Sequence, residues 1–176
     1  MISETKKKQK KIVIFIPSIE GGGVEKNLFI ISNFLSKKFS KVYISTTNYD
    51  MKNRFNKKIS FILPKSKQWQ KKGRFVKTLI CIWNLLLFWL RERNFMILSF
   101  QANIYSILFG YIFKVKVISR SNSAPEGWSK NIFKKIIFKI ILKFANTIIV
   151  NSYDFKKSLD RNFDVNSICI YNPLDR

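Results

Sequence analysis

A glycine-rich segment near the start of the chain has the residue types that can hold an anionic group. Gly21, Gly22 and Gly23 follow an apolar run at 12–16 and precede apolar residues at helical spacing from Leu28 to Leu35. This pattern predicts a buried strand, a turn and an amphipathic helix. At such a turn the first helical amides lack partners, and the absent side chains let a phosphate approach the backbone. Two interpretations are open: a phosphate-approaching loop, or only a tight strand-to-helix connection.

Two familiar phosphate loops are excluded by spacing. A dinucleotide fingerprint needs a third small residue where Lys26 stands, and an acidic residue where the second strand ends in Thr46, Thr47 and Asn48. A nucleoside-triphosphate loop needs Gly-Lys-Ser or Gly-Lys-Thr, and the chain contains neither triplet. The glycine loop therefore has no base-reading partner in its own segment.

The composition limits the chemistry further. The chain has 176 residues with 33 Lys and Arg against 10 Asp and Glu, a net charge of +23, and it contains no histidine. Catalysis that needs histidine is thereby excluded, and Cys81 and Cys169 lack metal-ligand spacing, so we expect no metal site and no cofactor. The positive charge has two open explanations, an AT-rich codon background or a functional basic face. Since no nucleic-acid-reading motif is present, we expect no nucleic-acid partner.

Strands alternate with helices along the rest of the chain. Further strands are expected at 41–47, 59–63, 95–100, 116–119, 147–150 and 167–171, and helices at 74–93, 102–113, 130–144 and 152–160. This alternation predicts an α/β fold with a parallel sheet covered by helices on both faces. Ligands bind beyond the carboxyl ends of such strands, which places 21–23, 101–103 and 120–122 along one rim.

Two of the expected helices are strongly apolar. The helix at 74–93 has an apolar middle at 78–90 that is too short to cross a bilayer, which takes roughly 20 apolar residues, so the helix either covers the sheet or lies in a membrane interface. The helix at 130–144 has one apolar stripe, of which part is expected to pack on the sheet, with lysines beside it. Either the lysines are a solvated face, or they form a membrane face. The residues expected on that membrane face are Trp128, Lys130, Lys134, Lys135, Lys139 and Lys143.

Four segments in this order resemble a known family. They are Ile-Pro-Ser-Ile-Glu-Gly-Gly-Gly-Val-Glu-Lys (16–26), Ile-Ser-Arg-Ser-Asn (118–122) with Pro-Glu-Gly-Trp after it, Ile-Ile-Val-Asn-Ser (148–152) and Tyr-Asn-Pro-Leu-Asp (171–175). Together they are similar to the amino-terminal half of family-four retaining glycosyltransferases. The resemblance implies a GT-B architecture, in which two Rossmann-like domains face a cleft, and this chain would be the amino-terminal, acceptor-side domain.

The resemblance also implies roles for individual residues. Gly21, Gly22 and Gly23 match the loop that approaches the donor phosphates. Glu25 is either a cleft residue or a favourable anion in the first helical turn. The acceptor and sugar cleft would be lined by Glu25, Gln101, Asn103, Arg120 and Asn122. The nucleotide sugar would be a co-substrate held mainly by a carboxyl-terminal domain, so the isolated chain is expected to be inactive.

The expected organisation and location follow from these observations. Residues 1–10 are a basic flexible start, 11–171 the domain, and 172–176 the beginning of a linker to an absent second domain. The apolar run at 12–16 is too short for a signal peptide, so we expect a cytoplasmic protein at the inner membrane face. Its partners would be a nucleotide sugar, a glycan or lipid-linked acceptor, an anionic membrane and a separate carboxyl-terminal domain. The rival interpretation is a truncated or non-catalytic membrane-associated module.

Overall fold

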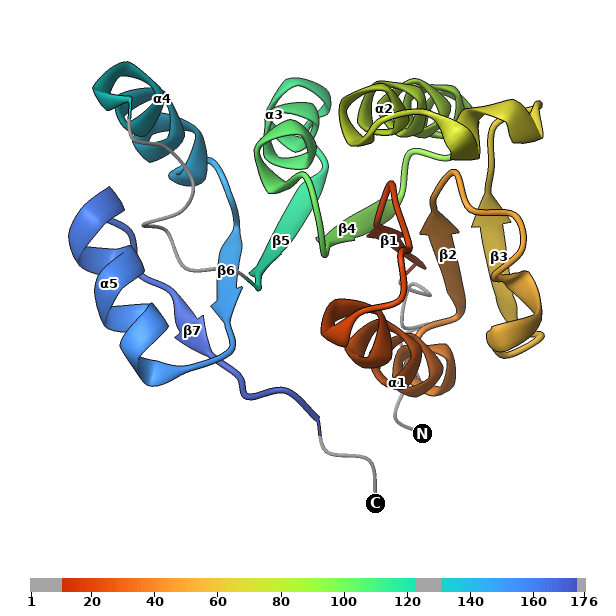
Figure 1. Ribbon diagram of the computed structural model, residues 1–176, viewed down its shortest axis with the longest axis horizontal. Coiled ribbons are helices and arrows are strands. Elements are labelled where there is room, and N and C mark those ends of the chain that lie inside the picture. The colour runs from red at the N-terminus through yellow and green to blue at the C-terminus, as the bar shows by residue number, and fades with distance from the viewer. Residues whose placement is uncertain (1–10, 123–130, 174–176) are drawn as a thin grey trace, which may run out of the picture.

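A computed structural model describes residues 11–122 and 131–173 of the chain. Its centre is a seven-stranded parallel sheet in the order β3-β2-β1-β4-β5-β6-β7 (Figure 1). The strands are β1 (Lys11–Phe15), β2 (Lys41–Ser45), β3 (Ile59–Ile62), β4 (Phe95–Ser99), β5 (Lys116–Ser121), β6 (Thr147–Val150) and β7 (Ile168–Cys169). The predicted α/β class with a parallel sheet is confirmed.

Helices cover both faces of this sheet. They are α1 (Gly23–Lys38), α2 (Arg74–Arg91), α3 (Asn103–Phe113), α4 (Ile132–Leu142) and α5 (Tyr153–Phe163), with short 3₁₀ helices at Lys52–Arg54 and Lys67–Lys71. Among the described residues, α1 alone packs on one face, while the other helices pack on the opposite face. Right-handed crossovers explain this split, because the chain leaves β1 towards one edge of the sheet and leaves β3 to β6 towards the other.

The core has two layers because each central strand is buried on both sides. Val13 and Phe15 of β1 pack with α2, α3 and their neighbours, while Ile12 and Ile14 pack with Leu28 of α1. Strands buried on both faces are continuously apolar, which is why the run at 12–16 does not alternate with polar residues. These strands hold the rim segments in a fixed frame.

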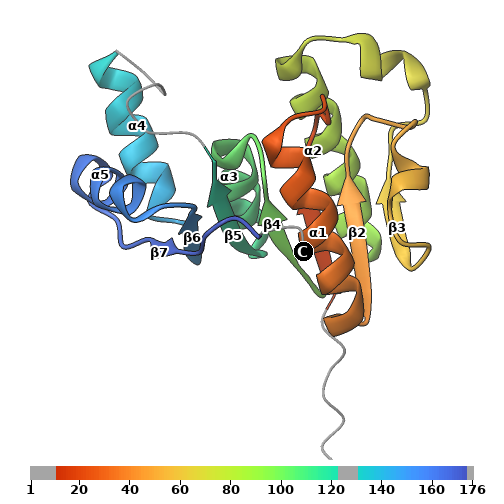
Figure 2. The same ribbon diagram turned by 60° about the horizontal axis from the view of Figure 1, so that its bottom comes forward.

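The strand order places one crevice between the connections that follow β1 and β4. β1 and β4 are neighbours, but the chain runs from β1 to β2 in one direction and from β4 to β5 in the other. The connections that follow β1 and β4 therefore diverge at the carboxyl ends of the two strands, where open α/β sheets bind ligands. In Figure 2 the start of α1 lies beside the start of α2 at this end of the sheet.

Several boundaries differ from the sequence predictions. β5 continues through Arg120 and Ser121, which pair with Ile149 and Val150 of β6, so the expected loop starts later. α5 begins at the predicted Ser152 cap but continues to Phe163. The expected start at 1–10, the end of the expected linker at 174–176, and Trp128 and Lys130 lie outside the described residues.

α4 buries a small part of its apolar surface. Part of its apolar stripe was expected to pack on the sheet, and Ile141 and Leu142 are buried, with Phe138 partly so. The other apolar side chains of α4 are exposed, and Phe133 is 73% exposed. Within the described ranges, no helix has the length and apolar character needed to cross a membrane.

Candidate functional site

A cleft of about 780 Å³ lies at the carboxyl ends of β1 and β4. Its polar side is formed by residues 17–25 after β1, by 100–103 after β4, and by Ser121 and Asn122 of β5 and the segment after it. Its apolar side is formed by side chains from α2, α3 and α4, among them Phe75, Tyr105 and Phe138. The structure thus brings Gly21 to Gly23, Glu25, Gln101, Asn103 and Asn122 together around one cleft.

The glycine loop presents free backbone donors at the start of α1. Gly21 has φ +83°, and Gly22 is the N-cap residue. The amide of Gly22 donates to Oε2 of Glu25 at 2.6 Å, whereas the amides of Gly21 and Gly23 have no acceptor among the described residues. A Cβ atom at Gly21 or Gly23 would meet nothing within 4 Å. Close packing therefore does not explain these two glycines, and both line the cleft.

Glu25 holds the loop in shape. Its carboxylate accepts from the amide of Gly22 and, through Oε1, from the amide of Glu20 at 3.1 Å. The side chain is buried and lies in the first turn of α1, where a negative charge is favourable. Of the two roles that the sequence left open for Glu25, these contacts match the helix-start role. Its contact with a ligand stays a prediction.

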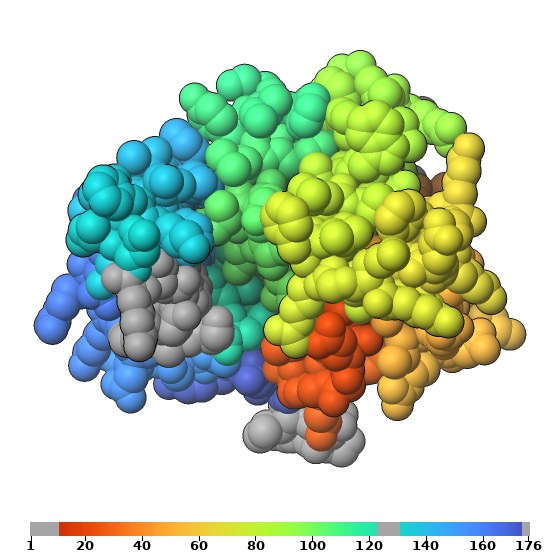
Figure 3. All heavy atoms as spheres, turned by 45° about the horizontal axis from the view of Figure 1, so that its top comes forward, coloured from red at the N-terminus to blue at the C-terminus, as the bar shows by residue number. Residues whose placement is uncertain are grey.

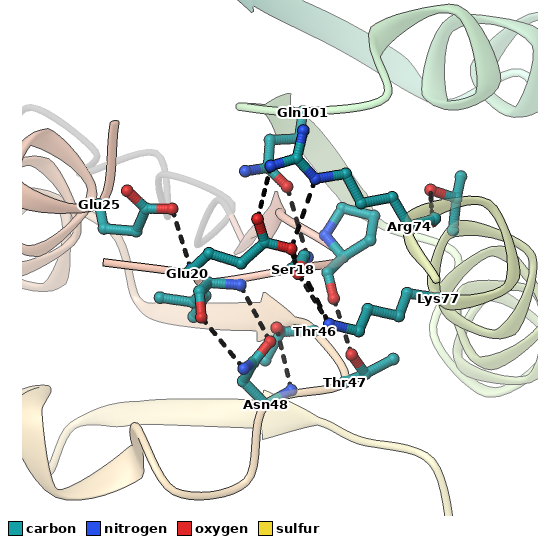
Figure 4. Close-up of polar contacts among 12 residues, drawn as sticks. Ser18, Glu20, Glu25, Thr46, Thr47, Asn48, Arg74, Lys77 and Gln101 are labelled. Atoms are coloured by element: carbon teal, nitrogen blue, oxygen red, sulfur yellow. Dashed lines mark hydrogen bonds and ion pairs between the residues drawn. The ribbon is translucent and has the colours of Figure 1, made fainter. Parts of the chain in front are cut away.

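The segment before the glycines is fixed by the end of β2. Thr47 donates through Oγ1 to the carbonyl oxygen of Pro17 at 2.9 Å. The Asn48 side chain accepts from the amide of Ile19 at 2.9 Å and donates to the Ile19 carbonyl oxygen at 3.1 Å. These polar residues occupy the place where a dinucleotide-binding fold has an acidic residue, and here they support the loop instead (Figure 4).

A buried lysine from α2 completes this support. Lys77 is only 7% exposed, and its Nζ donates to Oγ of Ser18 at 3.0 Å and lies 4.0 Å from Oε1 of Glu20. Ser18 in turn donates to Glu20 at 2.7 Å. Figure 4 shows Lys77 reaching from α2 to this cluster under the loop. A buried ammonium group needs such partners, so α2 and the loop are tied together by charge.

Arg74 closes the same cluster at the surface. Its guanidinium donates to both oxygens of Glu20, at 2.5 and 3.4 Å. Hydrogen bonds from Arg74 and then from Ser18 lower the pKa of Glu20 from 4.5 to about 2. Glu20 is therefore a paired carboxylate at neutral pH. With Glu25 engaged in the loop, neither carboxylate of the described cleft is a free base.

The connection after β4 uses amide groups instead of charges. Ala102 is the N-cap residue of α3 in the left-handed conformation, with φ 53°. Gln101 accepts from the Ser18 amide at 3.4 Å, and Asn122 donates to the Phe100 carbonyl oxygen at 3.1 Å. Asn103 donates to the Arg120 carbonyl oxygen at 3.1 Å, and its own Oδ1 is buried without a partner among the described residues. Asn103 thus joins the connection after β4 to β5, and its residue lines the cleft.

Arg120 does not join the other predicted cleft residues. It lies within β5, is 3% exposed, and is absent from the cleft lining. Its guanidinium donates to Asn172 at 2.8 Å and lies 6.0 Å from the Phe100 ring centre, while burial lowers its pKa. The expected rim-loop position is therefore wrong, because the polar run Ser119-Arg120-Ser121 is strand. A role for Arg120 with substrate stays a prediction.

The lysines of α4 divide into two pairs. Lys143 and Lys139 lie 2.7 and 3.5 Å from the carboxylate of Asp164, next to α5. Lys134 and Lys135 are exposed and have no ion-pair partner within the described part of the chain. The predicted membrane face therefore has fewer unpaired charges and more exposed apolar side chains than the sequence suggested.

Sequence reasoning missed the support cluster of Ser18, Glu20, Arg74 and Lys77. One signal was present: Lys77 shares helical spacing with Cys81 and Leu85, both buried, so it had to lie on the buried side of α2. In the described residues there is no group of His, Cys, Asp and Glu that could hold a metal ion.

Comparisons with known proteins agree with this fold. No family profile and no curated protein sequence matches the chain. Solved structures do match, first the Anabaena protein Alr3699/HepE in complex with UDP and glucose, with a TM-score of 0.64 and 13% identity over 94% of this chain and 45% of that one. The same protein with UDP-glucose gives a TM-score of 0.64.

A plant structure gives the same result. UGT73P12 of Glycyrrhiza uralensis, complexed with glycyrrhetinic acid 3-O-monoglucuronide, matches with a TM-score of 0.59 and 9% identity over 92% of this chain and 48% of that one. The chain spans less than half the length of these proteins. Its fold is a Rossmann-like domain of the kind found in GT-B glycosyltransferases, as predicted.

Proposed function

We propose that this chain is the amino-terminal, acceptor-side domain of a retaining glycosyltransferase. The observation that carries the proposal is the position of the cleft: it lies where β1 and β4 diverge, with the unpartnered amides of Gly21 and Gly23 on one side. Helix amino-termini with free amides favour anions, and the resemblance of 16–26 to the donor-phosphate loop supports a diphosphate as that anion. The Anabaena structures, one with UDP-glucose and one with UDP and glucose, support a nucleotide sugar as donor.

In this proposal the chain contributes charge stabilisation and acceptor positioning. Backbone amides of Gly21 and Gly23 stabilise the negative charge that develops on the departing diphosphate. Gln101, Asn103 and Asn122, which line the cleft, orient the acceptor hydroxyl by hydrogen bonds. Because Glu20 and Glu25 are both engaged, the described residues of the cleft supply no free carboxylate base. In this proposal the diphosphate group itself accepts the proton of the acceptor, as retaining transfer through an ion-pair-like route allows.

The remaining parts of the proposal concern what lies outside this domain. A carboxyl-terminal domain would bind most of the nucleotide sugar, and the 176-residue chain alone would show no turnover. The acceptor would be a glycan or a lipid-linked glycan precursor for cell-surface polysaccharide, met at the inner membrane face in the cytoplasm. The engagement of both cleft carboxylates also fits a second candidate, a non-catalytic module. A neighbouring reading frame that encodes a glutamate-bearing donor domain would favour the enzyme over that module.

A transfer assay tests the proposal. The chain is assayed together with the coding sequence that follows or neighbours it in its source genome, against a panel of nucleotide sugars and glycan or lipid-linked acceptors. Gly23→Val is expected to lower turnover at least about tenfold while the domain stays folded, because the added side chain meets no protein atom near its Cβ and takes up room in the cleft that Gly23 lines. Gly22 is a poorer probe, since a Cβ there lies 3.1 Å from Oε2 of Glu25 and disturbs the loop.

The matched control is Gly73→Val. Gly73 is the N-cap residue of α2, also has open space around it, and does not line the cleft. Its substitution is expected to leave turnover within about twofold of wild type. Equal turnover of Gly23→Val and wild type would refute the phosphate role of the loop, and turnover by the isolated chain would refute the need for a second domain.

A further inference from the structure

The outer surfaces of α2, α3 and α4 expose an unusual number of large apolar side chains. On α2 they are Phe75, Val76, Leu79, Trp83, Leu87 and Leu90; on α3 they are Tyr105, Tyr111 and Ile112; on and just after α4 they are Ile132, Phe133, Ile136, Ile137, Ile140 and Phe144. We call this set the apolar face. Exposed apolar patches of such extent mark interaction sites.

The apolar face is continuous across the three helices. The rings of Phe75 on α2 and Tyr105 on α3 are 6.3 Å apart, and those of Tyr111 on α3 and Phe144 after α4 stack at 4.1 Å. Figure 3 shows α2, α3 and α4 side by side across one surface, with the glycine loop at its edge. Phe75 and Tyr105 also line the cleft, so the face reaches the mouth of the candidate site.

The exposed apolar side chains of α2 lie on a different side of the helix from its buried ones. Leu79, Trp83 and Leu87 are exposed at spacings of four residues, whereas Cys81 and Leu85 on the other side of the helix are buried. The helix is thus apolar on both sides. Sheet packing accounts for one side only, and the second side has no covering element among the described residues.

The helices that carry this face have basic but no acidic residues. α2, α3 and α4 contain no aspartate or glutamate, whereas α1 contains Glu25 and α5 contains Asp154 and Asp160. Arg91 stands at the end of α2 and Lys134 and Lys135 stand on α4, while Arg74 at the start of α2 is paired with Glu20. An apolar centre with a cationic border is the pattern of a surface that sits at an anionic bilayer interface.

The geometry points to an anionic lipid bilayer as the partner of the apolar face, and we propose that the domain docks there by inserting apolar side chains from all three helices. A domain that followed this chain would start on the other side, because Arg120, on the α1 side of the sheet, binds Asn172. The inference does not depend on the proposed function, since docking needs neither donor nor acceptor.

Vesicle flotation with the purified 176-residue chain tests the proposal. Wild type is expected to float with vesicles of phosphatidylcholine and phosphatidylglycerol and more weakly with phosphatidylcholine alone. High salt should weaken binding but not abolish it, because insertion of apolar groups is not screened. Trp83→Gln and the pair Ile136→Gln with Ile140→Gln should each lower the partition coefficient about tenfold or more.

The matched control is Phe34→Gln on α1. Phe34 and Trp83 are both 58% exposed, but Phe34 lies on the opposite face. Its substitution is expected to leave partitioning within about twofold of wild type. Trp83→Phe should also bind like wild type, and lipids brominated in the acyl chain should quench the tryptophan fluorescence of wild type more than that of Trp83→Phe.

Three outcomes would overturn the proposal. One is equal loss of binding in Phe34→Gln and Trp83→Gln. Another is normal flotation of both apolar-face variants, with their fold verified by thermal melting. The third is a wild-type dimer in analytical ultracentrifugation that ignores vesicles and dissociates in the Trp83→Gln variant, which would make the face a contact between two copies.

Discussion

The two connections that flank the cleft are built on different principles. The loop after β1 is held by charged side chains of α1 and α2 and by the Thr47 hydroxyl and the Asn48 side chain after β2, and a Cβ at Gly21 or Gly23 would meet nothing within 4 Å. The connection after β4 is a tight turn at Ala102 that is held by amide hydrogen bonds to neighbouring strands. The loop after β1 therefore resembles an anion-binding loop, while the connection after β4 forms a fixed side of the cleft.

The glycines of the two regions give the sharpest test of this difference. A Cβ at Gly110, in the helix that follows the β4 connection, would lie 2.2 Å from Cγ2 of Val117 and 2.7 Å from the Val115 carbonyl oxygen. Gly110→Ala should therefore destabilise the domain by about 3 kcal/mol. Gly23→Ala should change stability by less than about 1 kcal/mol, because its Cβ meets nothing.

Urea denaturation of the purified variants measures both values. Gly73→Ala at the start of α2 serves as a second open-site control. If Gly23→Ala destabilised the chain as much as Gly110→Ala, the glycine loop would be a packing feature and the contrast between the two connections would disappear.

The next largest effect concerns the polar supports. Lys77→Met keeps the stem of the side chain but removes the donor to Ser18 and the charge beside Glu20. We expect a loss of about 2 kcal/mol, in the range of hydrogen bonds that involve a charged group. Asn103→Ala on the other connection removes a neutral amide donor to the Arg120 carbonyl oxygen and should cost about 1 kcal/mol.

The stability costs of Lys77→Met and Asn103→Ala should also differ in their dependence on salt. The cost of Lys77→Met should fall when sodium chloride is raised, since part of it is the attraction to Glu20, whereas the cost of Asn103→Ala should stay constant. Thermal melts at low and high salt give the comparison. An equal salt response in both variants would contradict the assignment of a charged support to one connection and a neutral support to the other.

Much of this architecture was predictable from the sequence, for a physical reason. Central strands of a parallel sheet are continuously apolar, so β1 and β6 could be placed from their residues, and the three glycines indicated the turn. The position of Arg120 could not be predicted, because the serines on either side of it are typical of loops. Their place in a strand depends on pairing with β6, which the local sequence does not show. The packing of α4 was not predictable either, since a periodic stripe shows which residues share a side but not what covers it.

The smallest predicted effect is a pH dependence confined to the β1 connection. Hydrogen bonds from Arg74 and Ser18 lower the pKa of Glu20 to about 2, below its ordinary value of 4.5. A carboxyl whose pKa is lower in the folded state stabilises the fold above the unfolded pKa, and this contribution is lost as the pH falls from about 4.5 towards 2. Because the Glu20 side chain is 42% exposed and the ion pair is screened, the contribution should be less than about 1 kcal/mol. Urea denaturation of wild type and Glu20→Gln between pH 3 and pH 7 measures this contribution. The free energy of unfolding of wild type is expected to exceed that of Glu20→Gln at pH 6 to 7, and this wild-type advantage should shrink towards pH 3. Asn122→Ala, which changes a neutral contact on the β4 and β5 side, is the control, and its cost should not vary with pH. A wild-type advantage over Glu20→Gln that stayed constant to pH 3 would mean that the Arg74 pair is absent in solution, and the β1 connection would then be held by neutral groups as its neighbour is.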